Sequence, residues 1–296
     1  MSYEHTANLQ IKELKRDGSV ESVEAVSCFL TSPTTFECRQ VTVGAQTYAV
    51  STCVLPGLDP RGNYLKECQD GIYVAHNGSG VLLVLMDGHG NDGLKVVKAC
   101  MTKIEQYFKE NSEGFEQEPQ SAIESMLLGC DRLVKADPNI DCSLSGSTAV
   151  AAYLNASGLH VGSVGDSRAV LGMLGSTVAQ PTQPPYKNSH FRHINSPRPI
   201  EAVQLSVDQK PNHVGEMDRI LKAGGRVAKI TDQYGKQVGP YRAWQKFGSL
   251  PGLAMSRSIG DQMGSEIGVI ATPVFNDFDL FTGCDLFIVL ASDGVW

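Results

Sequence analysis

The segment Val81–Gly93 (VLLVLMDGHGNDG) is the feature that most constrains how this chain can fold. Six apolar residues, Val81–Met86, follow one another without a polar break, as in a strand buried on both faces. The run ends in the carboxylate of Asp87, and a Gly-His-Gly turn that contains His89 lets the backbone bend and approach a ligand closely. We therefore predict a rigid buried strand that presents an acid and a histidine at its end.

A second segment near the end of the chain repeats this pattern. Leu286–Ala291 (LFIVLA) is an apolar run followed by Ser-Asp-Gly, which contains Asp293. If both strands lie side by side in one core, Asp87 and Asp293 converge, and two carboxylates ~4–6 Å apart repel by roughly 1–4 kcal/mol. Such a pair favours Mg²⁺, Mn²⁺ or Ca²⁺ between the oxygens. The alternative is that each Asp only caps an Asp-Gly turn.

Length and composition limit the class of protein. The chain has 296 residues, 42% hydrophobic and 19% charged, which suits one large globular domain or two smaller ones. The net charge of −7 argues against a nucleic-acid or anionic-membrane partner. Eight cysteines without a CxxC pair, no apolar leader and no membrane-length run predict a reducing compartment, cytoplasmic and/or nuclear, with no membrane partner.

The rest of the chain alternates between helical and strand patterns. The apolar spacing predicts helices over Leu94–Glu110 and Ser121–Ala136, each packing one face on a sheet. A short helix is expected within Gly215–Gly225, stopped by two glycines. Strands are expected over Gln46–Leu55, Ser147–Leu154, Leu159–Ser163 and Arg168–Met173. The last three predict an antiparallel meander, and a Gly-Asp-Ser turn between two of them holds a third acid, Asp166.

Two further segments have weaker signals. Gly175–Pro199 contains five prolines and the pair His190 and His193, and we interpret it as a surface loop or flap rather than a metal site. The chain stops at Trp296, just after the Ser-Asp-Gly turn, so we expect a sequence that is cut short.

The segment Gly88–Gly93 also matches the GxGxxG dinucleotide fingerprint. Asp87 and Asp92 would then face a pyrophosphate and repel it, and polar Asn111–Gln117 stands where the next strand should be. We favour a metal pair that lowers the pKa of a bound water to about 7. His89 lies close enough in sequence to give a proton to a leaving group, although a purely structural histidine is the alternative.

Eight motifs match a known family in the same order. They are Lys66–Gly71 (KECQDG), Met86–Gly90 (MDGHG), Gly146–Thr148 (GST), Val164–Arg168 (VGDSR), Leu205–Pro211 (LSVDQKP), Glu216–Val227 (EMDRILKAGGRV), Pro251–Asp261 (PGLAMSRSIGD) and Ala291–Trp296 (ASDGVW). Through these motifs the chain resembles the metal-dependent type 2C serine/threonine protein phosphatases (the PPM family) over roughly residues 45–296.

The resemblance implies a fold and a domain organisation. The fold class is α+β, a four-layer α-β-β-α sandwich of two antiparallel sheets flanked by helices, with its C-terminal part missing. Residues 1–40 are expected to be a partly ordered N-terminal extension. Residues 41–296 are expected to be an incomplete catalytic domain, with a loop or flap insertion around 175–200.

The resemblance also implies roles for single residues. Two Mg²⁺ or Mn²⁺ ions are expected, with a third, weaker site. Asp87 corresponds to the acid that bridges the two metals and His89 to the general acid. The other expected metal ligands are the Gly88 carbonyl, Asp293 at the first metal, Asp166 with Asp293 at the third, and Asp70 with Gln69 as the early pair.

Three departures from the family pattern stand out. Gln69 occupies a position that is often Glu and offers only a neutral oxygen. Leu65 stands near the place of the phosphate-binding Arg, which leaves Lys66 and Arg61 as candidates, and a lysine is a point charge rather than a bidentate fork. The late Asp-Asn motif and its strands are absent, so a sheet edge is expected to be open.

We therefore hypothesise metal-dependent hydrolysis of phosphoserine and phosphothreonine in proteins by a metal-bridging hydroxide. The expected partners are phosphorylated proteins, and the expected state is a monomer that binds no nucleic acid. The alternative is a catalytically impaired, phosphatase-like scaffold that binds partners, which Gln69 and the missing Arg favour.

Overall fold

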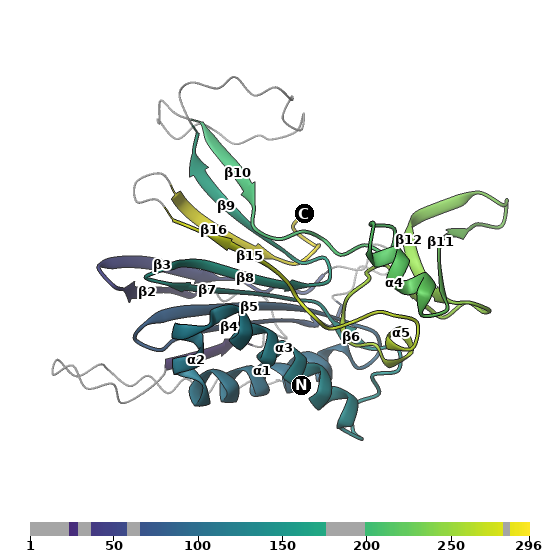
Figure 1. Cartoon of the computed structure of the whole chain (residues 1–296), viewed down its shortest axis with the longest axis horizontal. Helices are drawn as coiled ribbons and strands as arrows, with labels where there is room; N and C mark the ends of the chain where they lie inside the picture. Colours follow the sequence, from purple (N-terminus) through teal and green to yellow (C-terminus); the bar gives the residue numbers. More distant parts are fainter. Residues whose placement is uncertain (1–23, 29–36, 58–65, 176–198, 281–284) are drawn as a thin grey trace, which may run out of the picture.

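A large antiparallel sheet forms the centre of the molecule (Figure 1). The computed structural model describes residues 24–28, 37–57, 66–175, 199–280 and 285–296. The sheet runs in the order β1-β4-β5-β7-β8-β15, with β6 and β14 attached beside β5. Its strands are β1 (Glu24–Cys28), β4 (Asp70–His76), β5 (Gly80–His89), β6 (Gly146–Ser147), β7 (Ala149–Asn155), β8 (Gly158–Val164), β14 (Ile259–Gly260) and β15 (Val274–Phe278).

Strand β5 is the predicted buried strand, and its burial is confirmed. It lies between β4 and β7 and pairs antiparallel with both. Leu82 and Met86 are fully buried on one side, and Val81 and Leu85 are buried as well. Antiparallel partners on both sides exclude the parallel sheet of a dinucleotide-binding fold.

A smaller sheet packs against one face of the large sheet. Its order is β10 (Ile200–Gln204), β9 (Arg168–Leu174) and β16 (Asp285–Ala291). The core between the sheets includes Leu85, Val150, Leu159 and Leu171. The hairpin of β2 (Glu37–Val43) and β3 (Gln46–Thr52) extends this side and packs on Val81.

Two sequence-based expectations were wrong in this region. The meander does not continue from β8 to β9, because the turn at Asp166 carries the chain from the large sheet to the smaller one. The last apolar run is not buried on both faces, since Leu286 and Phe287 of β16 are nearly half exposed. An apolar run does not itself distinguish a central strand from one that covers a sheet on a single side.

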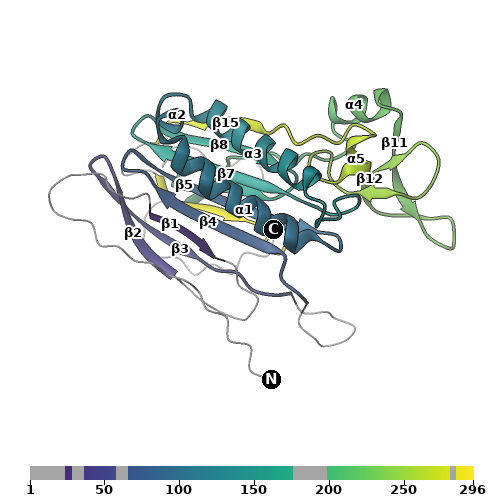
Figure 2. The same cartoon turned by 90° about the horizontal axis from the view of Figure 1, so that it is seen from below.

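Three helices cover the other face of the large sheet, as Figure 2 shows from below. They are α1 (Gly93–Glu110), α2 (Ser112–Gln117) and α3 (Pro119–Ala136), so both long helices were predicted nearly to the residue. Their buried faces pack with Tyr73 and Tyr153 of the sheet in the largest core. This gives the predicted α+β class with antiparallel sheets. Among the described residues, a helical layer occurs on this one side of the sandwich.

A small subdomain projects from one end of the sandwich (Figures 1 and 2). It contains α4 (Glu216–Lys222), α5 (Gln262–Ser265) and the sheet β11-β12-β13, and the short helix α4 was predicted. Its small core consists of Ile220, Ala243, Ile267 and Val269. The three strands are β11 (Gly225–Thr231), β12 (Gln237–Gln245) and β13 (Pro251–Leu253).

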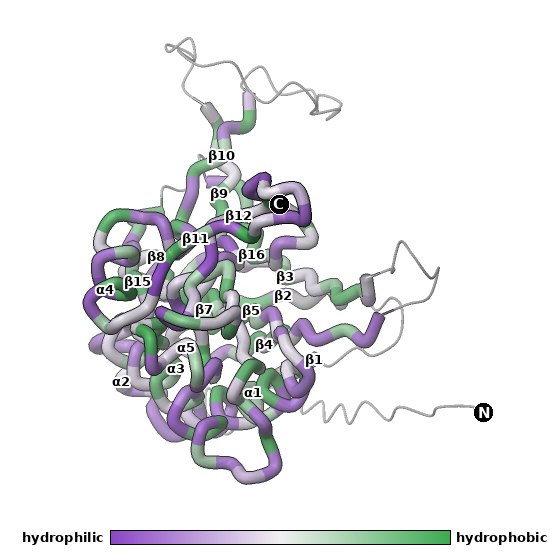
Figure 3. The backbone as a smooth tube through the Cα atoms, turned by 90° about the vertical axis from the view of Figure 1, so that its right-hand side faces the viewer, coloured by the Kyte–Doolittle hydropathy of each residue, from purple (hydrophilic) through white to green (hydrophobic). Residues whose placement is uncertain are grey.

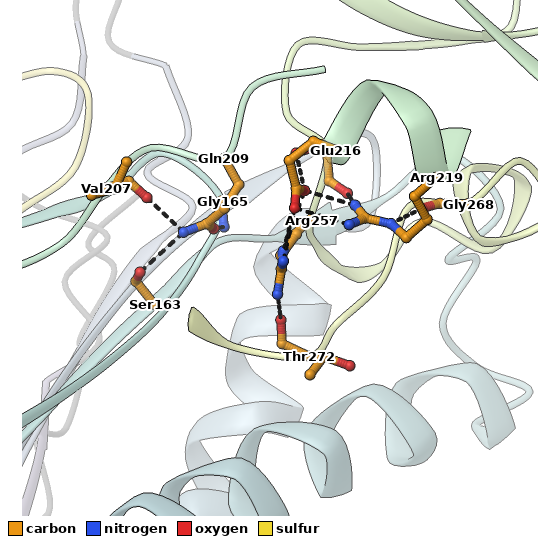
Figure 4. Close-up of polar contacts among 10 residues, drawn as sticks. Ser163, Gly165, Val207, Gln209, Glu216, Arg219, Arg257, Gly268 and Thr272 are labelled. Carbon is orange, nitrogen blue, oxygen red and sulfur yellow. Dashed lines mark hydrogen bonds and ion pairs between the residues drawn. The ribbon is translucent and has the colours of Figure 1, made fainter. Parts of the chain in front are cut away.

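A cluster of charged residues at Glu216 holds this subdomain in place (Figure 4). Arg219 contacts Glu216 at 2.7 Å and donates to the Gly268 carbonyl, and Arg257 contacts Glu216 at 2.7 Å and donates to the Thr272 carbonyl. Burial alone would raise the pKa of Glu216, but the hydrogen bonds from Arg219, Arg257 and Ser256 outweigh it and lower the pKa to about 2. The cluster therefore stays ionised at every physiological pH.

Some predicted features fall outside the described residues or across a strand. The flap around 175–200, with His190 and His193, lies almost entirely outside them. In the expected N-terminal extension 1–40, β1 pairs with β4 of the large sheet, and β2 crosses the expected boundary at residue 40. Within the described ranges, no helix has the length and apolar character needed to cross a membrane.

We expect Phe108→Ala to destabilise the fold strongly. Phe108 is fully buried and contacts the ring of Phe115 edge-to-face at 4.9 Å. Its truncation leaves a cavity beneath the sheet and should lower the free energy of unfolding by about 3–5 kcal/mol. Urea unfolding measures the change. Leu133→Ala at a position that is 38% exposed is the control and should cost less than about 1 kcal/mol; equal losses would contradict this view of the core.

Candidate functional site

Carboxylates from three strand ends lie within electrostatic range of one another at one end of the sandwich. Asp87 near the end of β5 lies opposite Asp70 at the start of β4 in the antiparallel register. Asp293, which follows β16, acts electrostatically on both of them. Ser292 donates to a carboxylate oxygen of Asp70 at 3.3 Å, and this contact joins the smaller sheet to the larger one. The structure thus brings the predicted acids Asp70, Asp87 and Asp293 together.

The ionised form of Asp87 is strongly disfavoured. Burial is the main cause, followed by the negative charges of Asp70, Asp293 and Asp166, and together they raise the pKa of Asp87 to about 7. In the part of the chain that the structure describes, no Lys or Arg forms an ion pair with Asp70, Asp87 or Asp293. The excess negative charge at this end of the sandwich is therefore not compensated by these residues.

His89 makes its closest polar contact with Asp261. Its Nε2 atom lies 2.6 Å from Oδ2 of Asp261, a residue of which only 1% is exposed. Burial disfavours a charged imidazole, but the hydrogen bond to Asp261 and the charges of Asp261, Asp87 and Asp166 outweigh it, so the pKa of His89 is raised. The side chain of His89 remains 28% exposed, so it can still reach a ligand.

The surroundings of Asp261 are built around its carboxylate. The hydroxyl of Ser258 donates to Oδ2 at 2.5 Å. A Cβ atom on Gly146 would lie only 2.1 Å from the same oxygen, so this position requires glycine. Asp261 itself has a left-handed φ of 42°, a conformation that Asp and Asn tolerate better than most residues do. The contact between Asp261 and His89 is thus fixed by backbone geometry.

Asp166 lies near the other acids but has a cationic neighbour. The ammonium group of Lys210 forms an ion pair with Asp166, and Lys210 is also 3.9 Å from Asp208. The turn that holds Asp166 is supported by Gln209, whose side chain accepts from the Gly165 N–H and donates to Ser163 and Val207 (Figure 4). A cation at Asp166 would therefore have to compete with Lys210.

The other predicted residues make separate contacts. The side chain of Gln69 donates to the Gly90 carbonyl at 3.1 Å and so engages the loop before α1. Lys66 is exposed, and its backbone N–H donates to Gly57. Arg61 lies outside the described residues. A Cβ atom on Gly88 would lie 2.8 Å from two backbone carbonyls, so a glycine is needed at this point of closest approach.

The donor set fits a hard divalent cation, but only with help from other oxygens. Carboxylate oxygens are the ligands that Mg²⁺ and Mn²⁺ prefer, and Mg²⁺ retains several waters. Among the described residues, no three His, Cys, Asp or Glu side chains are arranged so that they alone could hold a metal ion. Asp70, Asp87 and Asp293 would share such an ion with water and with a backbone carbonyl such as that of Gly88.

A pocket of about 210 Å³ opens beside this cluster, next to the projecting subdomain. His89 and Asp261 line one side, and Arg242 of β12 lines another. Arg242 donates to the Gly252 carbonyl at 2.6 Å, and its Nε atom is buried without a hydrogen-bond partner among the described residues. The pocket therefore lies between the pair His89 and Asp261 and the base of the β11–β12 hairpin.

Comparison with known sequences identifies the family. Residues 63–296 match the family described as "Protein phosphatase 2C". The chain belongs to the protein phosphatase 2C family. "Probable protein phosphatase 2C 12" from Oryza sativa subsp. japonica is 38% identical over 180 residues, 61% of this chain and 40% of that protein. "Probable protein phosphatase 2C 64" from the same organism is 34% identical over 222 residues, 73% and 46% of the two chains.

Solved structures show the same fold. The crystal structure of serine-threonine phosphatase 2C from Toxoplasma gondii matches with a TM-score of 0.64 and 18% identity, covering 92% of this chain and 83% of that one. A C. elegans sex determining protein matches with a TM-score of 0.55 and 18% identity, covering 89% and 52%. This phosphatase 2C chain spans less than half the length of the two rice relatives.

Sequence reasoning missed two parts of the site. It quoted Asp261 within a motif but gave it no role, and it did not anticipate the charged cluster at Glu216. His89 and Asp261 lie 172 positions apart, so no local spacing connects them. The one usable signal is the Gly-Asp step itself, because a glycine followed by an aspartate is typical of a turn or a close backbone approach.

We expect Asp87→Asn to stabilise the metal-free phosphatase 2C chain at high pH. The pKa of Asp87 is raised on folding from about 4 to about 7. The cost of ionising it is therefore absent below about pH 4 and complete above about pH 7. In EDTA at pH 8 the variant should be more stable than the wild type by about 1–3 kcal/mol, and at pH 4 the two should agree.

Thermal unfolding across this pH range measures the difference. Asp218→Asn, which removes an exposed carboxylate, should follow the wild type. Manganese should stabilise the wild type and leave Asp87→Asn nearly unaffected. If the stability of the wild type and of Asp87→Asn depended on pH in the same way, the claim that ionised Asp87 destabilises the fold would be wrong.

Proposed function

We propose that this chain carries the catalytic centre of a metal-dependent phosphatase acting on phosphoserine and phosphothreonine in proteins. The observation that supports this most is the half-buried carboxylate of Asp87, which other acids surround and which forms no ion pair with Lys or Arg among the described residues. Such a site repels a phosphate anion unless cations intervene. Divalent cations bound there would lower the pKa of coordinated water to about 7 and so supply hydroxide at neutral pH.

The chain's own residues have separate tasks in this proposal. Asp70, Asp87 and Asp293 bind the cations, and the backbone carbonyl of Gly88 adds an oxygen. Asp166 serves a third, weaker site, which Lys210 competes for. Gln69 positions the loop before α1 through its contact with Gly90. Lys66 and Arg61 are the candidates for contacts to the substrate phosphate.

His89 is the proposed proton donor to the leaving alkoxide. Its Nε2 atom is held by Asp261, which leaves the Nδ1 atom and the open side of the ring for the substrate. A carboxylate behind the imidazole fixes the ring orientation and favours the protonated form. The proposed partners of the chain are phosphorylated proteins, which it would bind as a monomer in the cytoplasm or nucleus.

Removing the carboxylate of Asp87 tests the phosphatase activity. We expect Asp87→Asn to lower manganese-dependent hydrolysis of p-nitrophenyl phosphate by more than about 100-fold, because a metal ligand is lost. Asp218→Asn should retain wild-type activity. Calorimetric titration with manganese gives an independent readout. Activity that survives unchanged would end the assignment, and no manganese binding by the wild type would favour the scaffold alternative.

A second prediction concerns Asp261, which positions His89. Asn tolerates the left-handed backbone at this position but cannot hold a charged imidazole as well. Asp261→Asn should therefore lower kcat on phenyl phosphate by about 10–100-fold, since a poor leaving group depends on general acid catalysis. On p-nitrophenyl phosphate, whose leaving group needs no proton, the loss should be only about twofold. Equal losses on both substrates would indicate a purely structural role for Asp261.

A further inference from the structure

The β11–β12 hairpin and the residues that flank it are basic in an acidic protein. Residues 222–250 contain six Lys or Arg and one Asp, whereas the whole chain has a net charge of −7. Among the described residues, none of the six forms an ion pair with Asp or Glu. The single acid, Asp232, accepts the backbone N–H groups of Tyr234 and Lys236 at 2.9 Å each, so it caps the turn. The six cations are Lys222, Arg226, Lys229, Lys236, Arg242 and Lys246.

Aromatic rings accompany three of these cations. Arg226 lies over Trp244 at 5.3 Å, Lys229 over Tyr241 at 5.1 Å, and Lys246 over Phe247 at 5.6 Å. Each contact restricts a long side chain while leaving its charge in solvent. Phe247 is 84% exposed. The hairpin therefore presents a surface that is cationic and aromatic together and is partly preorganised.

This surface continues into the pocket beside His89. The strand register places Arg226 opposite Trp244 and Ala228 opposite Arg242, so both arginines and the tryptophan share one face of the hairpin. Arg242 lines the same pocket as His89. Figure 3 views the molecule from this end. Arg242 therefore connects this face of the hairpin to the pocket beside His89.

Charge complementarity selects the occupant. The hairpin repels basic segments and attracts acidic ones, and the acid cluster beyond the pocket repels acidic residues there. Nucleic acid would meet the acidic remainder of the chain over most of its length. We propose that residues 222–250 dock acidic segments that flank the phosphorylated residue of a protein substrate. This rests on the proposed phosphatase function, since it names the substrate class of that same pocket.

Binding in EDTA tests the docking surface apart from catalysis. The probes are two fluorescein-labelled phosphothreonine peptides of equal length, one with Asp and Glu flanking the phosphate and one with Ser and Gly. By fluorescence anisotropy, the 296-residue chain should bind the acidic peptide about 5–10-fold more tightly, as expected from a few exposed ion pairs. The preference should vanish at 1 M salt, because exposed charges are screened.

Charge reversal on the hairpin supplies the decisive comparison. In Arg226→Glu/Lys246→Glu the affinity for the acidic peptide should fall to that for the neutral one. The control Lys103→Glu/Lys109→Glu makes the same charge change on α1 and should keep the preference. Equal binding of both peptides by the wild type, or equal loss in both double variants, would overturn the proposal. Tighter binding of a single-stranded DNA or of phosphatidylserine vesicles than of the acidic peptide would also overturn it.

Hydrolysis with manganese separates this proposal from the function on which it rests. The ratio of kcat/KM for the acidic peptide to that for the neutral one should be about 5–10 in the wild type and near one in the hairpin variant. Absence of hydrolysis of both peptides and of p-nitrophenyl phosphate would refute the phosphatase assignment. Hydrolysis without any preference between the peptides would refute the docking surface alone.

Discussion

Desolvation of one carboxylate, that of Asp87, is the constraint on which the rest of the site depends. Helices on one side and a second sheet on the other remove β5 from water, and the strand delivers Asp87 at the edge of that dry layer. The antiparallel register then places Asp70 directly opposite. A single desolvated acid can be neutralised by taking up a proton. Where several acids lie together, a bound cation offsets their mutual repulsion more effectively than protonation does, because one ion interacts with all of the carboxylates.

Much of the fold follows from local patterns, whereas its sheet assignment does not. The unbroken apolar run Val81–Met86 predicted the central strand, and the helical spacing of apolar residues in α1 and α3 predicted both long helices. Strand β16 looked equally apolar, yet it covers the core from one side only. The turn at Asp166 looked like a hairpin, yet it carries the chain between sheets. Which sheet receives a strand depends on long-range packing, which a short window of sequence does not contain.

The site shows the same division between local and distant information. Asp87 and His89 could be predicted from the sequence because these two reactive residues come directly after the apolar run of a buried strand. The role of Asp261 could not be predicted from the sequence, because it depends on a contact of 2.6 Å between its Oδ2 atom and Nε2 of His89, which is far away in the sequence. The ionised cluster of Glu216 with two arginines is likewise assembled from distant segments. These residues matter through their geometry, and geometry of this kind is a property of the folded chain.

His89 lies where the two halves of the molecule meet. One half is the sandwich, which carries the acidic side chains Asp70, Asp87 and Asp293. The other half is the projecting subdomain, which carries the basic side chains of the hairpin. Both reach the same pocket, through His89 and Arg242. Such a separation of charge would favour one orientation of a phosphorylated segment that binds there. In the proposed mode of binding, metal ions among the carboxylates would hold its phosphate, while acidic neighbours would be repelled by the carboxylates and attracted to the hairpin. A rigid joint is essential for this, because a hairpin that moved freely would average its field over many positions. The Glu216 cluster, ionised at every physiological pH, supplies that joint.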